Sequence, residues 1–198
     1  MIKTGVLAVQ GAFARHASAL EACGADMRIV KYREDLEDLD ALVLPGGEST
    51  TMTRLFGFRI DYEDLYRFAQ SRPVFGTCAG LILLGHGAHD PRVRQFSLLD
   101  ADITRNAYGS QKESFVEDIS LSFDPDTPFH AVFIRAPRID RPGAELRILA
   151  SSGGHPVLVE SQLYLGATFH PELTEDRRIH RYFIQKIKEI KNGKKQSA

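Results

Sequence analysis

The segment Pro73–Leu84, PVFGTCAGLILL, constrains the fold of this chain more than any other. A short apolar run leads to Cys78, which has a glycine two positions before it and another two positions after it, and a second apolar run follows. This pattern is typical of a nucleophile elbow, in which a strand turns sharply into a helix and exposes one side chain. Small residues are needed because the backbone there is strained and packs closely on its neighbours. Taken alone, the segment fits a buried core cysteine equally well, since free cysteines are among the most buried residues.

The first quarter of the chain predicts a parallel β-sheet. The near-continuous apolar run at 5–9 is typical of a strand that is buried on both faces, and residues 27–30 and 41–44 are expected to form a second and a third strand. Residues 12–23 have the apolar spacing of a helix, so the order of elements favours parallel strands with right-handed crossovers. Loops at the carboxyl ends of parallel strands form the ligand crevice. We therefore expect the loop after the third strand and the cysteine turn to lie at one edge of the sheet.

The middle of the chain predicts short strands separated by turns. We expect strands at 101–105, 113–117, 131–135, 147–150 and 156–160. Proline-containing turn signals occur at 124–126 and 141–143. The spacing of these strands predicts an antiparallel extension of the sheet.

The C-terminal part predicts the last strand and a closing helix. Residues 163–169 form an apolar run, and residues 177–191 have the periodicity of an amphipathic helix. The polar residues 193–198 are expected to form a frayed tail. Because the sequence has no linker and no repeat, and 43% of it is hydrophobic, we expect one domain over residues 1–198.

Charge and cysteine content exclude several classes of protein. The net charge of −1 does not favour a nucleic-acid-binding surface. Cys23 and Cys78 make a poor disulfide framework and lack the spacing of a zinc site. The N-terminus begins directly with a strand pattern rather than a signal peptide, and no apolar run has the length of a membrane span. We therefore expect a soluble, cytoplasmic protein with reduced thiols.

The segment His170-Pro171-Glu172 follows the predicted last strand. Proline biases the residue before it towards an extended conformation, in which residues i and i+2 project to the same side. His170 and Glu172 can therefore approach each other, with the carboxylate fixing the tautomer of the imidazole, as a general base requires. An exposed His and Glu at a strand end is the simpler interpretation of this segment alone. The cysteine turn in the same sheet favours the general base.

Two loops, one rich in glycine and one in histidine, are further candidate sites. The Gly46-Gly47 pair offers backbone N–H groups suited to an oxyanion, although a tight turn would have the same sequence. This loop lacks the lysine of a phosphate-binding Walker motif. The loop 85–95 contains His86, His89 and Asp90, but without the spacing of metal ligands, so we expect a solvated loop and no metal site.

Several motifs together resemble a known family. LPGGEST at 44–50, GTCAG at 76–80 and FHPE at 169–172 resemble the class I, triad-type glutamine amidotransferases. VLAVQGAF, ITRNAYGSQ, FIRAP and FHPELTEDRRIHRYF resemble more closely the glutaminase subunits of pyridoxal 5′-phosphate synthase. The resemblance spans residues 6–183 and implies a three-layer, flavodoxin-like α/β fold, with a mixed, mostly parallel sheet and helices on both faces. The loop 106–111 departs from the usual family pattern at Tyr108 and Ser110.

The resemblance also implies roles for individual residues. Cys78 is expected to be the nucleophile, His170 the acid–base and Glu172 its orienting partner. Gly47 and Ala79 are expected to supply the oxyanion N–H groups. The glutamine-binding positions correspond to Gly47, Glu48, Ser49, Arg105, Ile134 and Arg135. The two arginines also suit the α-carboxylate of free glutamine, which a guanidinium can bind.

These roles imply hydrolysis of L-glutamine through a cysteinyl thioester, without a metal or an organic cofactor. By resemblance, the ammonia would pass to a synthase subunit within a large hetero-oligomer. Three alternatives remain: a glutaminase subunit of another pathway, such as imidazole glycerol phosphate synthesis, a different cysteine hydrolase or stress protein of a related fold, and a non-catalytic binding module on the same fold. The RNAYGSQ motif argues against the first, HPE after the last strand against the second, and the intact Cys, His and Glu against the third.

Overall fold

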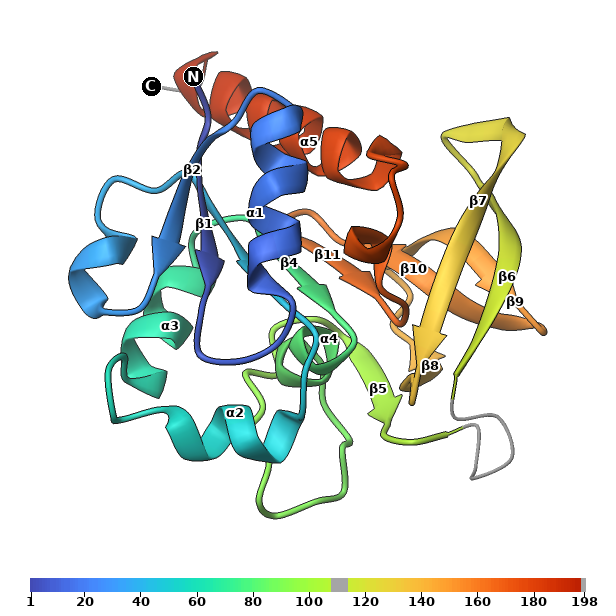
Figure 1. Cartoon of the computed structure of the whole chain (residues 1–198), viewed down its shortest axis with the longest axis horizontal. Helices are drawn as coiled ribbons and strands as arrows, with labels where there is room; N and C mark the ends of the chain where they lie inside the picture. Colours follow the sequence, from blue (N-terminus) through green and yellow to red (C-terminus); the bar gives the residue numbers. More distant parts are fainter. Residues whose placement is uncertain (108–113, 197–198) are drawn as a thin grey trace.

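The computed structural model describes residues 1–107 and 114–196. Within these residues, seven strands form one sheet in the order β2-β1-β3-β4-β11-β10-β9 (Figure 1). In that order, the strands are β2 Asp26–Val30, β1 Lys3–Leu7, β3 Ala41–Leu44, β4 Val74–Thr77, β11 Tyr164–Ala167, β10 His155–Glu160 and β9 Arg147–Ser152. All pairings from β2 to β11 are parallel, and β10 and β9 are antiparallel to their neighbours. The expected α/β fold with a mixed, mostly parallel sheet is confirmed.

Helices cover both faces of this sheet (Figure 1). The helices α1 (Phe13–Ala22) and α5 (Arg178–Gln196) pack on one face. The other face carries α2 Ser49–Leu55, α3 Tyr62–Ala69, α4 Ala79–Leu84 and the short 3₁₀ helix η1 Arg33–Leu36. Successive side chains of a strand point to opposite faces, so β3 contributes alternately to the two apolar cores.

Two further pairs of strands lie outside this sheet. The strands β5 (Ala101–Thr104) and β8 (Arg138–Pro142) form one antiparallel pair. The strands β6 (Ser114–Leu121) and β7 (Asp124–Ile134) form another, the long hairpin in Figure 1. The predicted antiparallel extension is therefore correct only for β9 and β10. The apolar residues of the other two pairs are buried in the cores on opposite faces of the sheet, so these strands cover its faces instead of lengthening its edge.

Several predicted boundaries differ from the structure. The chain reverses at Ser122 and Phe123, and the predicted turn at 124–126 is instead the start of β7. Pro125 is tolerated there because a two-stranded pair has outer edges that need no N–H donor. The strand β8 was not expected.

The ends of the chain and one loop also differ from expectation. The closing helix continues to Gln196, so the expected frayed tail from Gly193 is helical over most of its length, because lysine and glutamine are good helix formers. The loop 85–95, expected to be solvated, buries Ala88 and Val93 against one core. None of the described helices is long and apolar enough to cross a membrane.

Candidate active site

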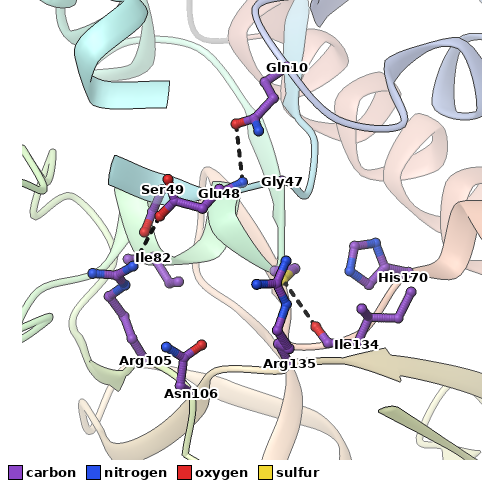
Figure 2. A pocket seen from close by; sticks show the side chains of 11 residues that line it. Gln10, Gly47, Glu48, Ser49, Ile82, Arg105, Asn106, Ile134, Arg135 and His170 are labelled. Atoms are coloured by element: carbon purple, nitrogen blue, oxygen red, sulfur yellow. Dashed lines mark hydrogen bonds and ion pairs between the residues drawn. The ribbon is translucent and has the colours of Figure 1, made fainter. Parts of the chain in front are cut away.

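The candidate site lies where several strands end at the same edge. The strands β1, β3, β4 and β11 are parallel, and the segments after them contain Gln10, Gly47, Cys78 and His170 respectively. These four residues line one cavity of about 260 Å³ (Figure 2). The topology therefore brings together residues that are up to 160 positions apart in the sequence.

Cys78 stands at a sharp turn between β4 and α4. Its backbone has φ 47° and ψ −104°, a conformation that residues with a side chain seldom adopt. The N–H of Cys78 donates to the carbonyl of Ala167 at 2.8 Å, which ties the turn to β11. A Cβ on Gly80 would lie 1.9 Å from the carbonyl oxygen of Leu44, so only glycine permits this approach. The predicted elbow therefore has a steric cause.

His170 and Glu172 form the hydrogen-bonded pair that the HPE segment predicts. Nδ1 of His170 lies 2.8 Å from Oε1 of Glu172, and both residues are buried. Pro171 begins the one-turn 3₁₀ helix η3 (Pro171–Leu173), which brings the carboxylate back towards the ring. The backbone N–H of His170 donates to Val132 of β7 at 2.8 Å. A Cβ on Gly46 would lie 2.3 Å from Cε1 of the imidazole, so this glycine makes room for the ring.

The charges around His170 favour its protonated form. Burial alone would lower the pKa of His170, but hydrogen bonds and charge interactions with Cys78 and Glu172 raise the pKa to about 10. Burial likewise works against the ionised form of Glu172, yet His16 and His170 hold the pKa of this carboxyl well below its usual value. The pair therefore presents a carboxylate and an imidazolium, and the latter can stabilise a thiolate at Cys78.

The loop after β3 ends in a carboxylate that caps a helix. Glu48 accepts hydrogen bonds from the N–H groups of Thr50 and Thr51 at 3.1 and 2.8 Å. Burial opposes ionisation, but the hydrogen bonds from the two threonines lower the pKa of Glu48 to about 2. The backbone N–H of Glu48 in turn donates to Oε1 of Gln10 at 3.1 Å (Figure 2). Ser49 is buried beside the cavity, and its hydroxyl has no hydrogen-bond partner among the described residues.

Two arginines line the cavity in different ways. Nη2 of Arg105 lies 3.2 Å from Oε1 of Glu48 (Figure 2). Nη1 of Arg105 also pairs with Oδ2 of Asp90. Arg135 is exposed at the rim, has a φ of 42°, and forms no ion pair with the described residues. The carbonyl oxygen of Ile134, the residue before it, lies 3.9 Å from Sγ of Cys78. With the described residues alone, the guanidinium of Arg105 is therefore paired and that of Arg135 is not.

The structure gathers most of the residues expected from the sequence. Of these, the cavity is lined by Gly47, Glu48, Ser49, Cys78, Arg105, Ile134, Arg135 and His170. Glu172 lies behind His170 and does not line it, and neither does Ala79, the first residue of α4. The N–H of a first helical residue has no partner within its helix and is thus available to a ligand. Tyr108 and Ser110 lie outside the described residues.

Sequence reasoning missed four residues at this site. Gln10, Ile82 and Asn106 line the cavity, and Asp90 holds Arg105. Gln10 could have been found, because it follows the first parallel strand just as Gly47 follows the third. Asp90 could not, because its partner is 15 residues away across a loop without regular structure. Within the described residues, no three His, Cys, Asp or Glu side chains are placed to hold a metal ion.

Comparisons with known proteins relate almost the whole chain to one family. A model of the SNO glutamine amidotransferase family matches residues 6–189. "Pyridoxal 5'-phosphate synthase subunit PdxT" of Solibacter usitatus is 46% identical over 192 residues, covering 94% of this chain and all of the relative. The protein of the same name from Halalkalibacterium halodurans is 49% identical over 195 residues, covering 96% and 97%. A solved structure described as a glutamine amidotransferase matches with a TM-score of 0.83 and 42% identity, covering 93% of this chain and 98% of that one.

Proposed function

Because the chain belongs to the SNO glutamine amidotransferase family, we propose that it hydrolyses L-glutamine to L-glutamate and ammonia at Cys78. The observation that carries this proposal is a cysteine at a strained strand–helix turn, beside a buried histidine that a carboxylate orients. These three groups are what nucleophilic catalysis at a carboxamide requires. Residues 1–198 form one glutaminase domain in this proposal.

The first half of the reaction forms a thioester. The thiolate of Cys78 attacks the side-chain carbonyl carbon of glutamine, and the N–H groups of Gly47 and Ala79 stabilise the tetrahedral oxyanion. One such donor is typically worth about 10²–10³ in rate, or about 3–4 kcal/mol. The imidazolium of His170 gives its proton to the nitrogen that leaves, and the C–N bond breaks as ammonia departs. Glu172 holds Nδ1 throughout, so that Nε2 faces the reacting atoms.

The second half of the reaction releases glutamate. The neutral imidazole of His170 takes a proton from water as the oxygen attacks the thioester carbonyl. The C–S bond then breaks, Cys78 leaves as a thiolate, and His170 is again protonated. Neither half requires a metal ion or an organic cofactor.

The charges around the cavity suit a free amino acid. Arg135 has no ion pair among the described residues and can bind the α-carboxylate with two parallel hydrogen bonds. Glu48 stays ionised, so it can accept from the α-ammonium group, and Arg105 holds it in place. The Ser49 hydroxyl, unpartnered within the described residues, supplies a further polar contact. Together with Gly47 and Ile134, these groups form the glutamine site.

The pathway follows from the relatives. Relatives 46% and 49% identical to this chain over nearly their whole length bear the name pyridoxal 5′-phosphate synthase subunit PdxT. The chain is accordingly the glutaminase subunit of such a synthase and supplies ammonia for pyridoxal 5′-phosphate synthesis. It works in the cytoplasm, docked to a synthase subunit in a large hetero-oligomer.

The direct test is glutamate release from glutamine by the purified chain, with and without the cognate synthase subunit and ribose 5-phosphate. We expect release that appears or rises strongly with the synthase subunit, and that Cys78→Ala abolishes. Release that is indifferent to the synthase subunit would retain the cysteine chemistry and reject the pathway. No release under any condition would favour a non-catalytic module, and unchanged release by Cys78→Ala would reject the assigned nucleophile.

A further inference from the structure

Two fully buried histidines continue the line of polar groups behind Glu172. His16 of α1 and His180 of α5 have no exposed surface. Nε2 of His16 lies 3.2 Å from Oε2 of Glu172, and its Nδ1 lies 3.0 Å from Nε2 of His180. Neither histidine lines the cavity. Burial of two imidazoles in an apolar core costs free energy unless their hydrogen bonds are made, so their alignment with the carboxylate calls for an explanation.

The hydrogen positions follow from the contacts. Oε2 of Glu172 is buried and has no other partner among the described residues, so His16 must carry a hydrogen on Nε2 to avoid opposing a carboxylate with a lone pair. Nδ1 of His16 then accepts, and His180 donates from its Nε2. Nδ1 of His180 is then an acceptor that has no partner among the described residues. If both hydrogen bonds ran in the opposite direction, Nδ1 of His180 would carry a buried hydrogen without a partner, and Oε2 of Glu172 would have no donor.

The surroundings hold both rings in place. Nε2 of His16 also lies 3.2 Å from Oγ1 of Thr77, the residue that precedes the nucleophile. The ring of Phe75 meets both imidazoles edge-on, with centroid distances of 6.1 Å to each. Burial keeps the pKa of His180 far below its ordinary value, so this ring is neutral. Because the rings of His16 and His180 are held in place, their hydrogen bonds can keep one direction, from His180 to His16 and from His16 to Glu172.

We propose that His16 is a positioning residue for catalysis, which holds the second oxygen of Glu172 so that the first orients His170, while His180 fixes the tautomer of His16. The proposal rests on the proposed glutaminase function. The two histidines thereby extend the His170–Glu172 pair of the triad to a chain of four buried side chains, from α1, η3, α5 and the segment after β11. His16 touches neither the substrate nor the reacting atoms.

The test compares two conservative variants of His16 in glutamine hydrolysis by the complex with the synthase subunit. In His16→Gln the amide nitrogen can occupy the place of Nε2 and donate to Glu172. In His16→Asn the shorter side chain faces His180 and cannot reach Glu172. We expect His16→Asn to lower kcat at least 10-fold with KM changed less than twofold, and His16→Gln to recover most of kcat. Equal losses in both variants, or a loss confined to KM, would overturn the proposal.

A double-mutant cycle shows whether His16 acts through Glu172. In a Glu172→Gln background, His16→Asn should lower kcat by less than a further twofold. A full additional 10-fold loss would mean that His16 acts by another route. Wild type and Cys78→Ala are measured alongside, because failure of the wild type to release glutamate would reject the proposed function and not this inference.

A second measurement does not depend on turnover or on a variant that folds. Ring ¹⁵N spectra of the uniformly labelled wild-type chain distinguish the two neutral tautomers of histidine. We expect His180 to be neutral with its hydrogen on Nε2, and Nε2 of His16 to be protonated. An unprotonated Nε2 on His16 would contradict the proposal whatever the kinetics.

Discussion

Backbone strain is concentrated at single residues around the cavity. Cys78, Asn106 and Arg135 all line it, and their φ angles are 47°, 49° and 42°. A residue with a side chain pays about 1–3 kcal/mol for such a conformation and keeps it only where its surroundings enforce it. Here the enforcing contacts include the hydrogen bond from Cys78 to Ala167. The strained backbone at Cys78 is thus held by its contact with β11.

The protonation of His170 predicts how stability depends on pH. Its pKa rises from 6.5 to about 10 on folding, so its contribution is complete below about pH 6.5 and is lost as the pH rises through about 10. We expect the gap in unfolding free energy between wild type and His170→Gln to narrow steadily over this range. Urea denaturation at pH 6, 8 and 10 measures the gap. A gap that stays constant would show that the imidazole is neutral in the folded state.

Asp90 is expected to tune substrate affinity through Arg105. Its side chain is only 14% exposed and holds the guanidinium against Glu48. Asp90→Asn removes this charge, so we expect KM for glutamine to rise about 10-fold with kcat changed little. Asp100→Asn is the matched control, because Asp100 is an exposed carboxylate beside His86 and does not line the cavity. Equal KM values for the two variants would exclude a role of Asp90 in binding.

At the scale of elements, the turn between β4 and α4 depends on a close approach of two backbones. Gly80 leaves no room for a methyl group beside Leu44, so Gly80→Ala must displace α4 or β3. We expect a loss of about 1–3 kcal/mol in unfolding free energy, with a greater loss of glutaminase activity. Gly193→Ala in α5 is the control, since a Cβ there would meet no atom of the described residues within 4 Å, and it should be neutral or stabilising. Similar stability of the two variants would refute the steric argument.

Elements specified by local signals were predictable from the sequence, and those specified by distant contacts were not. The elbow and the HPE turn carry their own glycines and proline, so the segments around Cys78 and His170 could be read directly. The separation of β6 and β7 from the main sheet could not be predicted, because it depends on which face of the sheet Phe129 and Phe133 cover. The link from Glu172 to His16 joins positions from distant elements, and helix periodicity shows only that His16 faces the core.

At the scale of the whole molecule, the sheet is completed by strands from both halves of the chain. The strand β4 lies between β3 and β11, and both pairings are parallel. We therefore expect the amides of β4 to open only when the main sheet does, whereas within residues 1–107 and 114–196 β6 and β7 pair only with each other. We expect the amides of β4 and β11 to exchange hydrogen at the rate of global unfolding, and those of β6 and β7 much earlier. Exchange measured at increasing urea checks this, and uniform protection would contradict it.

The position of β11 in the middle of the sheet has a consequence for protein synthesis. A ribosome completes Cys78 and its glycine-rich turn long before it reaches β11, His170 and the helix that carries His180. Until those last segments emerge, β4 lacks its neighbour β11, and Cys78 lacks the His170–Glu172 pair that we propose activates it. The nascent chain therefore holds an inert cysteine for most of its time on the ribosome. In the proposed mechanism, a translation product that ends before η3 lacks part of the triad, so it is not expected to hydrolyse glutamine.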